Sequence, residues 1–341
     1  MGSAPSIESR PEPMEPVSHV SQVAVNPPNV VYRGHSKEDA RRSGCEGEQP
    51  PDHHSSPEAQ DTRKVYNIED IQNSDMDTVV DATDKESSHL VITPKIGQKI
   101  ALVRHAETMN EAFPGWYSAC VCKEQYNAKD LNHPVKLPLR SKGLYIYNLD
   151  PPITRLSEYA AKLLGKALAS ESGIKWDNVI TAPELAAVQT GSIIASSTTG
   201  DKNYISIDES LCDLSHKKMD FMTTMELLKM DVSARVTQVI RNKESLDDSL
   251  GRVVGEIDHV QRSIHGNLIV VVGPMAFDAI LCQLLGTPRT KTKKRKPIPQ
   301  LASIILEKGP KSWNLNKKQV LPISSNYYAA KAFDLSAYIT K

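Results

Sequence analysis

The chain has 341 residues, enough for two domains by length, and its 41 Lys and Arg residues balance its 41 Asp and Glu residues. A balanced charge gives no overall field that would favour nucleic acid or a membrane surface as a partner. The longest apolar run, residues 268–272, is too short to cross a bilayer, and no segment has the apolar core of a signal peptide. We therefore expect a soluble, cytoplasmic protein.

The cysteines also favour the cytoplasm. The chain contains Cys45, Cys120, Cys122, Cys212 and Cys282. Their odd number and the lack of CxxC or Cys/His spacing argue against a disulfide framework and against a metal site. We predict reduced thiols, no metal and no cofactor, with Cys120 and Cys122 on alternate faces of one segment.

Residues 1–95 are rich in Pro, Ser, Glu and Asp and show no sustained hydrophobic period. Such a segment cannot bury enough apolar area to offset its ordering entropy, so we predict a disordered N-terminal tail. Two short pieces, residues 23–32 and 64–71, could serve as docking motifs. The first residues, MGSAPS, match the pattern for N-myristoylation at Gly2, but no basic cluster follows, so we expect membrane contact only if Gly2 is lipidated.

From residue 96 to residue 341 the pattern predicts one folded domain in which strands alternate with helices. The predicted strands are 99–105, 176–182, 267–273 and 301–308, the last of the chain; the predicted helices are 156–170, 184–197 and 276–286, closed by Gly286. Short, continuously apolar strands between helices favour an α/β fold with a parallel sheet covered on both faces. Ligands bind such sheets at the carboxyl ends of the strands, where His105 and Gly273 both fall.

Three motifs carry a family resemblance: LVRHAETMN, then PITRLSEYAAKLLGKAL, then TAPELAAVQTG. Together they resemble the histidine phosphatase (phosphoglycerate mutase-like) superfamily, in which an Arg-His-Gly-Glu signature closes the first strand and an S-P-x-x-R-x-x-Q-T-A turn and helix follow. Residues 130–154 are similar to the insertion of the branch that includes the ubiquitin-associated and SH3 domain-containing phosphatases and ecdysteroid-phosphate phosphatase. The resemblance implies a phosphoglycerate mutase-like three-layer sandwich, a phosphohistidine intermediate and, as is common in the family, a possible homodimer.

The same resemblance implies roles for individual residues. His105 would be the nucleophile, Arg104 the first phosphate ligand and Asn110 a further contact, while Glu107 orients its neighbours. Asp213, in ESLCDLSHKK, stands at the position of the acid that protonates the leaving oxygen.

The chain departs from the family pattern at two phosphate-binding positions. The second arginine is replaced by Ala186 and the second histidine by Gly273, whereas the change of the signature glycine to Ala106 is milder. Deleting one transition-state donor typically slows a reaction by about a hundred- to a thousandfold. The two losses together predict a pocket with little turnover, unless another group compensates.

Candidate compensators are His216, three residues after Asp213, and His265, just before the strand that ends at Gly273; Lys217 and Lys218 could supply charge. A separate basic run extends from Arg289 to Lys296. It could bind phosphates or acidic peptides or act as a nuclear import signal, although such runs are often solvated loops.

Three functions remain open from the sequence. The first is a pseudophosphatase that acts by binding protein partners or an anionic ligand. The second is a working phosphatase for a phosphotyrosine-like or other phosphomonoester substrate, which the acid position Asp213 keeps open. The third is an adaptor that works through the tail and the basic run.

Overall fold

The computed structural model describes residues 95–199, 204–213, 220–238, 244–288, 297–323 and 335–338, together with the backbone of residues 64–66. All of them belong to one unit of the chain, residues 51–341. Most of the predicted tail and the whole basic run from Arg289 to Lys296 lie outside the described residues, as do His216, Lys217 and Lys218.

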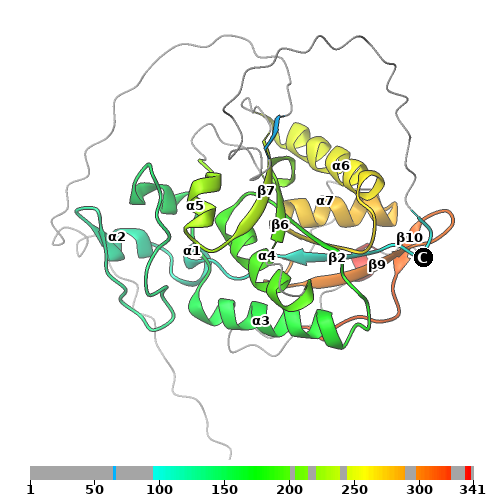
Figure 1. Ribbon diagram of the computed structural model, residues 1–341, viewed down its shortest axis with the longest axis horizontal. Helices are drawn as coiled ribbons and strands as arrows, with labels where there is room; N and C mark the ends of the chain where they lie inside the picture. The colour runs from blue at the N-terminus through cyan, green and yellow to red at the C-terminus, as the bar shows by residue number, and fades with distance from the viewer. Residues whose placement is uncertain are drawn as a thin grey trace, which may run out of the picture. The chain divides into compact units, whose positions relative to one another are not determined.

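A central sheet of eight strands organises the described part of the chain, in the order β1-β7-β6-β5-β8-β2-β9-β10 (Figure 1). Five neighbouring strands run parallel: β7 (Ser233–Gln238), β6 (Tyr204–Asp208), β5 (Asn178–Thr181), β8 (Leu268–Val272) and β2 (Lys99–Arg104). Three strands are antiparallel to their neighbours: β1 (Lys64–Tyr66), β9 (Ser303–Lys308) and β10 (Trp313–Leu315). The prediction of a mostly parallel sheet is therefore confirmed.

Helices cover both faces of this sheet, as Figure 1 shows. On one face α3 (Arg155–Ser170) packs against α4 (Leu185–Thr198), and α4 contacts β5, β6 and β8. On the other face α6 (Leu246–Ser263) packs against α7 (Pro274–Leu285), which contacts β2 and β10. The three-layer α/β architecture expected from the sequence is confirmed.

The described residues also form several shorter elements. They are α1 (Met109–Ala112), α2 (Trp116–Cys120), β3 (Val121–Cys122), β4 (Gln125–Tyr126), η3 (Leu144–Asn148), η4 (Glu209–Leu211), α5 (Thr224–Leu228) and η5 (Leu335–Ala337). Cys120, the last residue of α2, is buried, whereas Cys122, the last residue of β3, is exposed; the two thiols thus differ in exposure but belong to two elements rather than one segment.

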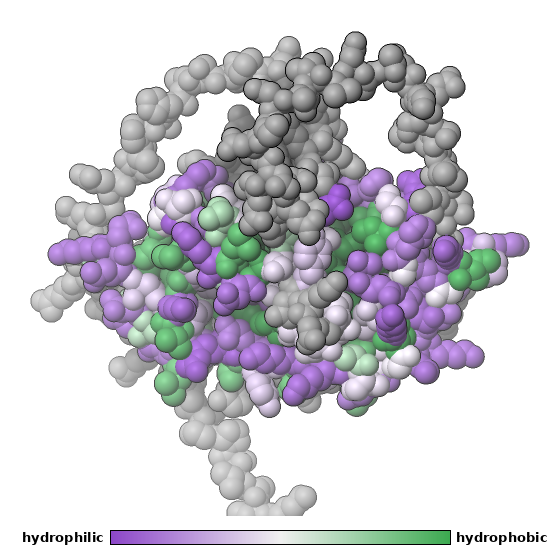
Figure 2. Space-filling view, viewed as in Figure 1, coloured by the Kyte–Doolittle hydropathy of each residue, from purple (hydrophilic) through white to green (hydrophobic). Residues whose placement is uncertain are grey.

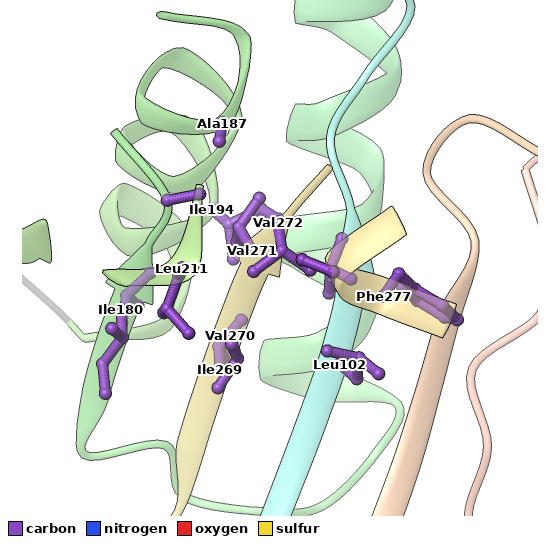
Figure 3. Close-up of a cluster of buried hydrophobic side chains, with 14 of the residues drawn as sticks. Leu102, Ile180, Ala187, Ile194, Leu211, Ile269, Val270, Val271, Val272 and Phe277 are labelled. Atoms are coloured by element: carbon purple, nitrogen blue, oxygen red, sulfur yellow. The ribbon is translucent and has the colours of Figure 1, made fainter. Parts of the chain in front are cut away.

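The core lies between the sheet and its helices, where Leu102, Val270 and Phe277 are fully buried (Figure 3). All five residues of β8 are buried, because this strand has neighbours on both sides and helices over both faces. A strand in this position needs apolar side chains on both faces, which explains the uninterrupted run LIVVV.

The helices begin and end at recognisable residues. Thr154 caps α3 by accepting a hydrogen bond from the Ser157 backbone N–H, and Ser245 forms a capping box with Asp248 at the start of α6. Gly286 closes α7 in the left-handed conformation, at φ 65°, as the sequence predicted. Within the described ranges, none of the helices is both long and apolar enough to span a membrane.

Several elements differ from the sequence prediction. Strand β9 is not the last of the chain, because β10 follows and pairs with it, and α7 begins at Pro274, two residues before the predicted start. Strand β1 lies inside the segment predicted to be disordered, where its backbone pairs with β7. Strands β6 and β7 and the long helix α6 were not predicted.

Candidate active site

His105 follows β2 directly, at the carboxyl edge of the sheet. Its backbone N–H donates to the carbonyl of Val272 on β8 (3.0 Å), and its side chain is buried. The ring Nδ1 lies 2.8 Å from the carbonyl oxygen of Ala106. A proton on Nδ1 would donate to this oxygen and leave the lone pair of Nε2 available. Burial and the neighbouring Arg104 lower the pKa of His105, so its imidazole is neutral at physiological pH.

Arg104, the last residue of β2, is already paired inside the protein. Its guanidinium forms an ion pair with Glu111 and donates to the carbonyl oxygen of Ile298. The Glu111 carboxylate is held in turn by the backbone N–H of Thr108 (2.8 Å) in the capping box of α1. The guanidinium of Arg104, which the family resemblance predicts to bind phosphate, is therefore paired with the carboxylate of Glu111.

Asp213 lies at the start of α7, although it follows β6 and η4 in the sequence. Its carboxylate accepts hydrogen bonds from the backbone N–H groups of Met275 (3.1 Å) and Ala276 (2.7 Å). These amides are part of the positive end of a twelve-residue helix. Burial raises the pKa of Asp213, and the hydrogen bonds from the two amides oppose that rise.

Gly273, where the family carries its second histidine, is the N-cap of α7 and has an ordinary extended conformation (φ −72°, ψ 170°). Any residue can adopt that backbone, so the requirement for glycine is one of space. A Cβ atom at this position would lie 2.4 Å from Cγ of Asp213. The Asp213 carboxylate therefore fills the volume that a side chain at residue 273 would need.

Ala186, where the family carries its second arginine, is buried in the first turn of α4. Its carbonyl oxygen accepts a hydrogen bond from the Thr190 hydroxyl (2.7 Å), which also accepts one from the backbone N–H of Ala106 (3.0 Å). Helix α4 thus fixes the residue after His105 through Thr190, but it places a methyl group where a second guanidinium would bind phosphate.

Glu184 was missed by the sequence analysis, and it lies beside Asp213. Its Oε1 accepts a hydrogen bond from the backbone N–H of Asp213 (2.8 Å). Burial and the Asp213 carboxylate raise the pKa of Glu184 to about 7. No local signal marks this contact, because the two residues are brought together by neighbouring strands.

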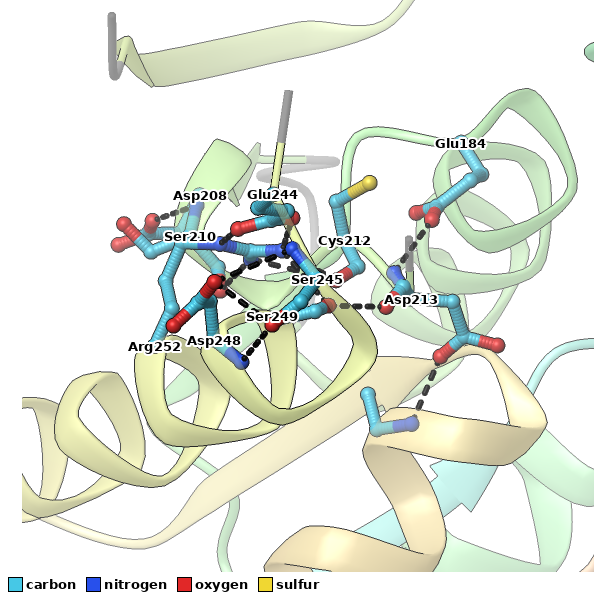
Figure 4. A network of polar contacts seen from close by, with 11 residues as sticks. Glu184, Asp208, Ser210, Cys212, Asp213, Glu244, Ser245, Asp248, Ser249 and Arg252 are labelled. Atoms are coloured by element: carbon cyan, nitrogen blue, oxygen red, sulfur yellow. Dashed lines mark hydrogen bonds and ion pairs between the residues drawn. The ribbon is translucent and has the colours of Figure 1, made fainter. Parts of the chain in front are cut away.

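A polar network holds the segment that carries Asp213 from behind (Figure 4). Arg252 on α6 donates to the carbonyl oxygens of Ser210 and Cys212 and pairs with Glu244. The Ser249 hydroxyl donates to the carbonyl oxygen of Asp213. These contacts fix the backbone from residue 210 to residue 213, so the carboxylate stays at the start of α7.

The remaining sequence candidates do not join this group. Asn110 is exposed; its amide donates to the Asn148 carbonyl (3.2 Å) and accepts from Trp116 Nε1 (2.6 Å), so it is committed to the insertion. His265 precedes β8 and lies at the end of that strand opposite Gly273. A five-residue strand spans roughly 16 Å, so His265 and His105 lie at opposite edges of the sheet.

Glu107 is buried beside His105, and its carbonyl oxygen accepts the backbone N–H of Thr154 (3.0 Å). Glu111, like Glu184, was missed, although Thr108 and Glu111 have the spacing of a capping box. In the described part of the chain, no three His, Cys, Asp or Glu side chains are grouped so as to hold a metal ion.

Comparisons with known proteins identify relatives of this chain. The chain is 28% identical over 247 residues to ecdysteroid-phosphate phosphatase of Drosophila melanogaster, which covers 67% of this chain and 33% of that protein. It is 28% identical over 245 residues to ubiquitin-associated and SH3 domain-containing protein B of Mus musculus, which covers 65% of this chain and 38% of that protein. The chain thus spans only about a third of the length of these curated relatives.

A solved structure has the same fold. The crystal structure of the ecdysone phosphate phosphatase of Bombyx mori in complex with tungstate superposes with a TM-score of 0.56 at 22% sequence identity, covering 71% of this chain and 100% of that one. Residues 100–320 match the sequence profile of the Histidine phosphatase superfamily (branch 1). Since the match covers more than half of the chain, this protein belongs to the histidine phosphatase superfamily.

Proposed function

We propose that this chain is a catalytically impaired histidine phosphatase domain, a pseudophosphatase that acts by binding protein partners. One observation carries the proposal: internal carboxylates take up the groups that would hold a phosphate. Glu111 pairs with Arg104, and Asp213 occupies the start of α7 and the space beside Gly273.

The electrostatics support the same conclusion. A phosphoryl group carries negative charge, and its transfer is accelerated by donors and cations aimed at the phosphoryl oxygens. Burial and Arg104 lower the pKa of His105, and Glu111 and Asp213 lie close enough to oppose that lowering. An incoming phosphate would have to displace these carboxylates or tolerate their repulsion.

The first test is turnover of p-nitrophenyl phosphate by the full chain from pH 4 to 8, beside His105→Ala. The ecdysteroid-phosphate phosphatase of Drosophila melanogaster serves as the positive control. We expect wild type and His105→Ala to hydrolyse the substrate equally slowly. A wild-type rate at least tenfold above that of His105→Ala would overturn the proposal.

A second candidate, an active phosphomonoester phosphatase, is favoured by the protonation states at the site. His105 is neutral, as a nucleophile must be, while burial raises the pKa values of Asp213 and Glu184. In this mechanism Nε2 of His105 attacks phosphorus, and the P–O bond to the leaving group breaks as a carboxylic acid protonates that oxygen. Water then attacks the phosphohistidine, releases inorganic phosphate and restores the imidazole.

This second candidate makes a distinct chemical prediction. Full chain mixed with p-nitrophenyl phosphate and quenched in base should carry phosphate on His105 that acid removes. Failure to find it within seconds of mixing would count against an active enzyme. The adaptor function of residues 1–95 and of the run from Arg289 to Lys296 stays a prediction, to be tested by deleting the first and neutralising the second.

A further inference from the structure

The outer side of α3 carries an apolar stripe that the fold does not use. Leu156, Tyr159 and Leu163 are exposed to 68%, 64% and 44%, and Leu131 of the insertion is exposed to 89%. The spacing of the three helix residues places them on one side of α3, over roughly 10 Å of its length. Leu131 adjoins the start of the helix, where its carbonyl oxygen accepts a hydrogen bond from Arg155 Nη1 (3.3 Å). We call these four residues the α3 stripe.

The α3 stripe does not contribute to the hydrophobic core. A separate buried side of α3, which includes Ala161, Leu164 and Leu168, already faces the rest of the fold. Single exposed apolar residues are ordinary on a protein surface, but four adjoining ones leave a strip of apolar area in water. Figure 2 shows apolar side chains between hydrophilic ones on the face of the molecule that carries α3.

A row of positive charge runs beside the stripe. Arg155, Lys162 and Lys166 are exposed and lie on one flank of α3, where the helical repeat sets them next to the stripe. The carboxylate beside this row on α3 is Glu158, whose half-buried side chain interacts electrostatically with Lys162 and Arg155. Three cations against one carboxylate leave this flank positive, although the whole chain has a formal net charge of +0.

The charge row discriminates between possible occupants. In an antiparallel two-fold pairing of two copies, the basic row of one α3 would face the basic row of the other, which is unfavourable. A partner helix with apolar residues at the same spacing and a flanking row of Asp or Glu would satisfy both features at once.

We propose that the α3 stripe is a docking surface for an acidic amphipathic helix of a partner protein. This inference does not rest on loss of catalysis, because the surface is built from α3 and the insertion rather than from His105 and its neighbours. The two ideas can therefore fail separately.

The probe is a synthetic, fluorescein-labelled helical peptide with Leu at positions i, i+3 and i+7 and a flanking row of Glu; a matched peptide carries Lys in place of Glu. Fluorescence anisotropy with the full chain should show that the acidic peptide binds about tenfold more tightly than the basic one. Leu156→Ser/Leu163→Ser and, separately, Lys162→Glu/Lys166→Glu should each weaken binding about tenfold. Leu321→Ser, which changes another exposed leucine, should bind like wild type.

Either of two results overturns the proposal. The first is equal binding of both peptides, or binding that survives both double substitutions. The second is a dimer in sedimentation velocity that Leu156→Ser/Leu163→Ser dissociates, since the stripe would then bind a second copy. Because the charge variants alter only exposed side chains, they keep the test decisive if the leucine variant unfolds. Hydrolysis of p-nitrophenyl phosphate, measured in parallel, reports on the proposed function alone.

Discussion

At the scale of single residues, Asp213 and Gly273 compete for one small volume. A Cβ at residue 273 would displace a carboxylate that accepts two backbone hydrogen bonds. Restoring the family histidine at this position is therefore not a local repair, because the imidazole could enter only after Asp213 had left the start of α7. The glycine at residue 273 and the present position of Asp213 therefore depend on each other.

This coupling predicts a non-additive mutant cycle. Gly273→Ala should lower the free energy of unfolding by about 1 to 2 kcal/mol, the typical contribution of a helix cap, because it expels Asp213. Asp213→Ala should cost a similar amount, and the double variant no more than either single one. Urea denaturation measures all three.

The control for the cycle is Gly255→Ala on α6, where an added Cβ meets no atom within 4 Å. That substitution should leave stability unchanged or raise it by about 0.5 to 1 kcal/mol. Additive costs for Gly273→Ala and Asp213→Ala would show that the two residues do not share a volume.

The proposed function predicts that Glu111 competes with anions for Arg104, so its removal should open the site to anions. Glu111→Gln keeps an acceptor for the Thr108 N–H but removes the charge that pairs with Arg104. We expect the affinity for tungstate or inorganic phosphate, measured by isothermal titration calorimetry on the full chain, to rise roughly tenfold. Glu171→Gln, at an exposed carboxylate beyond α3, is the control. An unchanged affinity would mean that Glu111 does not block the anion.

At the scale of elements, α4 approaches β5 so closely that one glycine is required. A Cβ on Gly191 would lie 2.2 Å from Cγ2 of Thr181. Gly191→Ala should therefore cost about 1 to 3 kcal/mol in the free energy of unfolding. Adding Thr181→Ser removes the obstructing methyl group and should recover most of that stability, as followed by urea denaturation. No recovery in the double variant would place the strain elsewhere on α4.

The elements also show what the sequence could predict. Strands β2 and β8 were predicted because burial on both faces imposes continuous apolar runs. Strand β7 was missed although its side chains alternate, with Ala234 and Val236 buried and Arg235 exposed, a period of two that indicates a half-buried strand. Helix α6 was missed because Gly251 and Gly255 weaken its helical signal, although the Ser245 capping box was readable.

The site was only partly predictable. The positions of Arg104, His105, Ala186 and Gly273 followed from motifs that are local in sequence. The contacts around those positions could not be predicted from local motifs. The Glu184–Asp213 contact, for example, spans 29 residues and depends on how the strands pair. The sequence predicted that Ala186 and Gly273 replace phosphate ligands, and only the fold shows that the Asp213 carboxylate fills the space beside Gly273.

At the scale of the whole molecule, Glu184 couples folding to pH. Its carboxyl keeps a proton up to about pH 7 in the folded chain but loses it near its ordinary value of 4.5 on unfolding. The folded state therefore binds more protons between these values, so stability falls as pH rises through this window. Glu184→Gln keeps the acceptor for the Asp213 N–H and removes the titration.

We expect thermal denaturation of Glu184→Gln to show a flatter stability profile between pH 4.5 and 7 and, at pH 7, a gain of roughly 1 to 3 kcal/mol over wild type. Glu171→Gln should follow the wild-type profile. If the two variants behave alike, Glu184 does not govern this pH dependence.

Asp150 connects the insertion to the first turn of α4. One oxygen of its buried carboxylate accepts from Arg140 Nη1 (3.0 Å) and the other from the backbone N–H of Leu185, the first residue of α4 (2.7 Å). Withdrawal of this carboxylate would expose the Leu185 amide to solvent and would also break its hydrogen bond with Arg140. We therefore expect the insertion and the first turn of α4 to open together, as one cooperative unit in native-state hydrogen exchange.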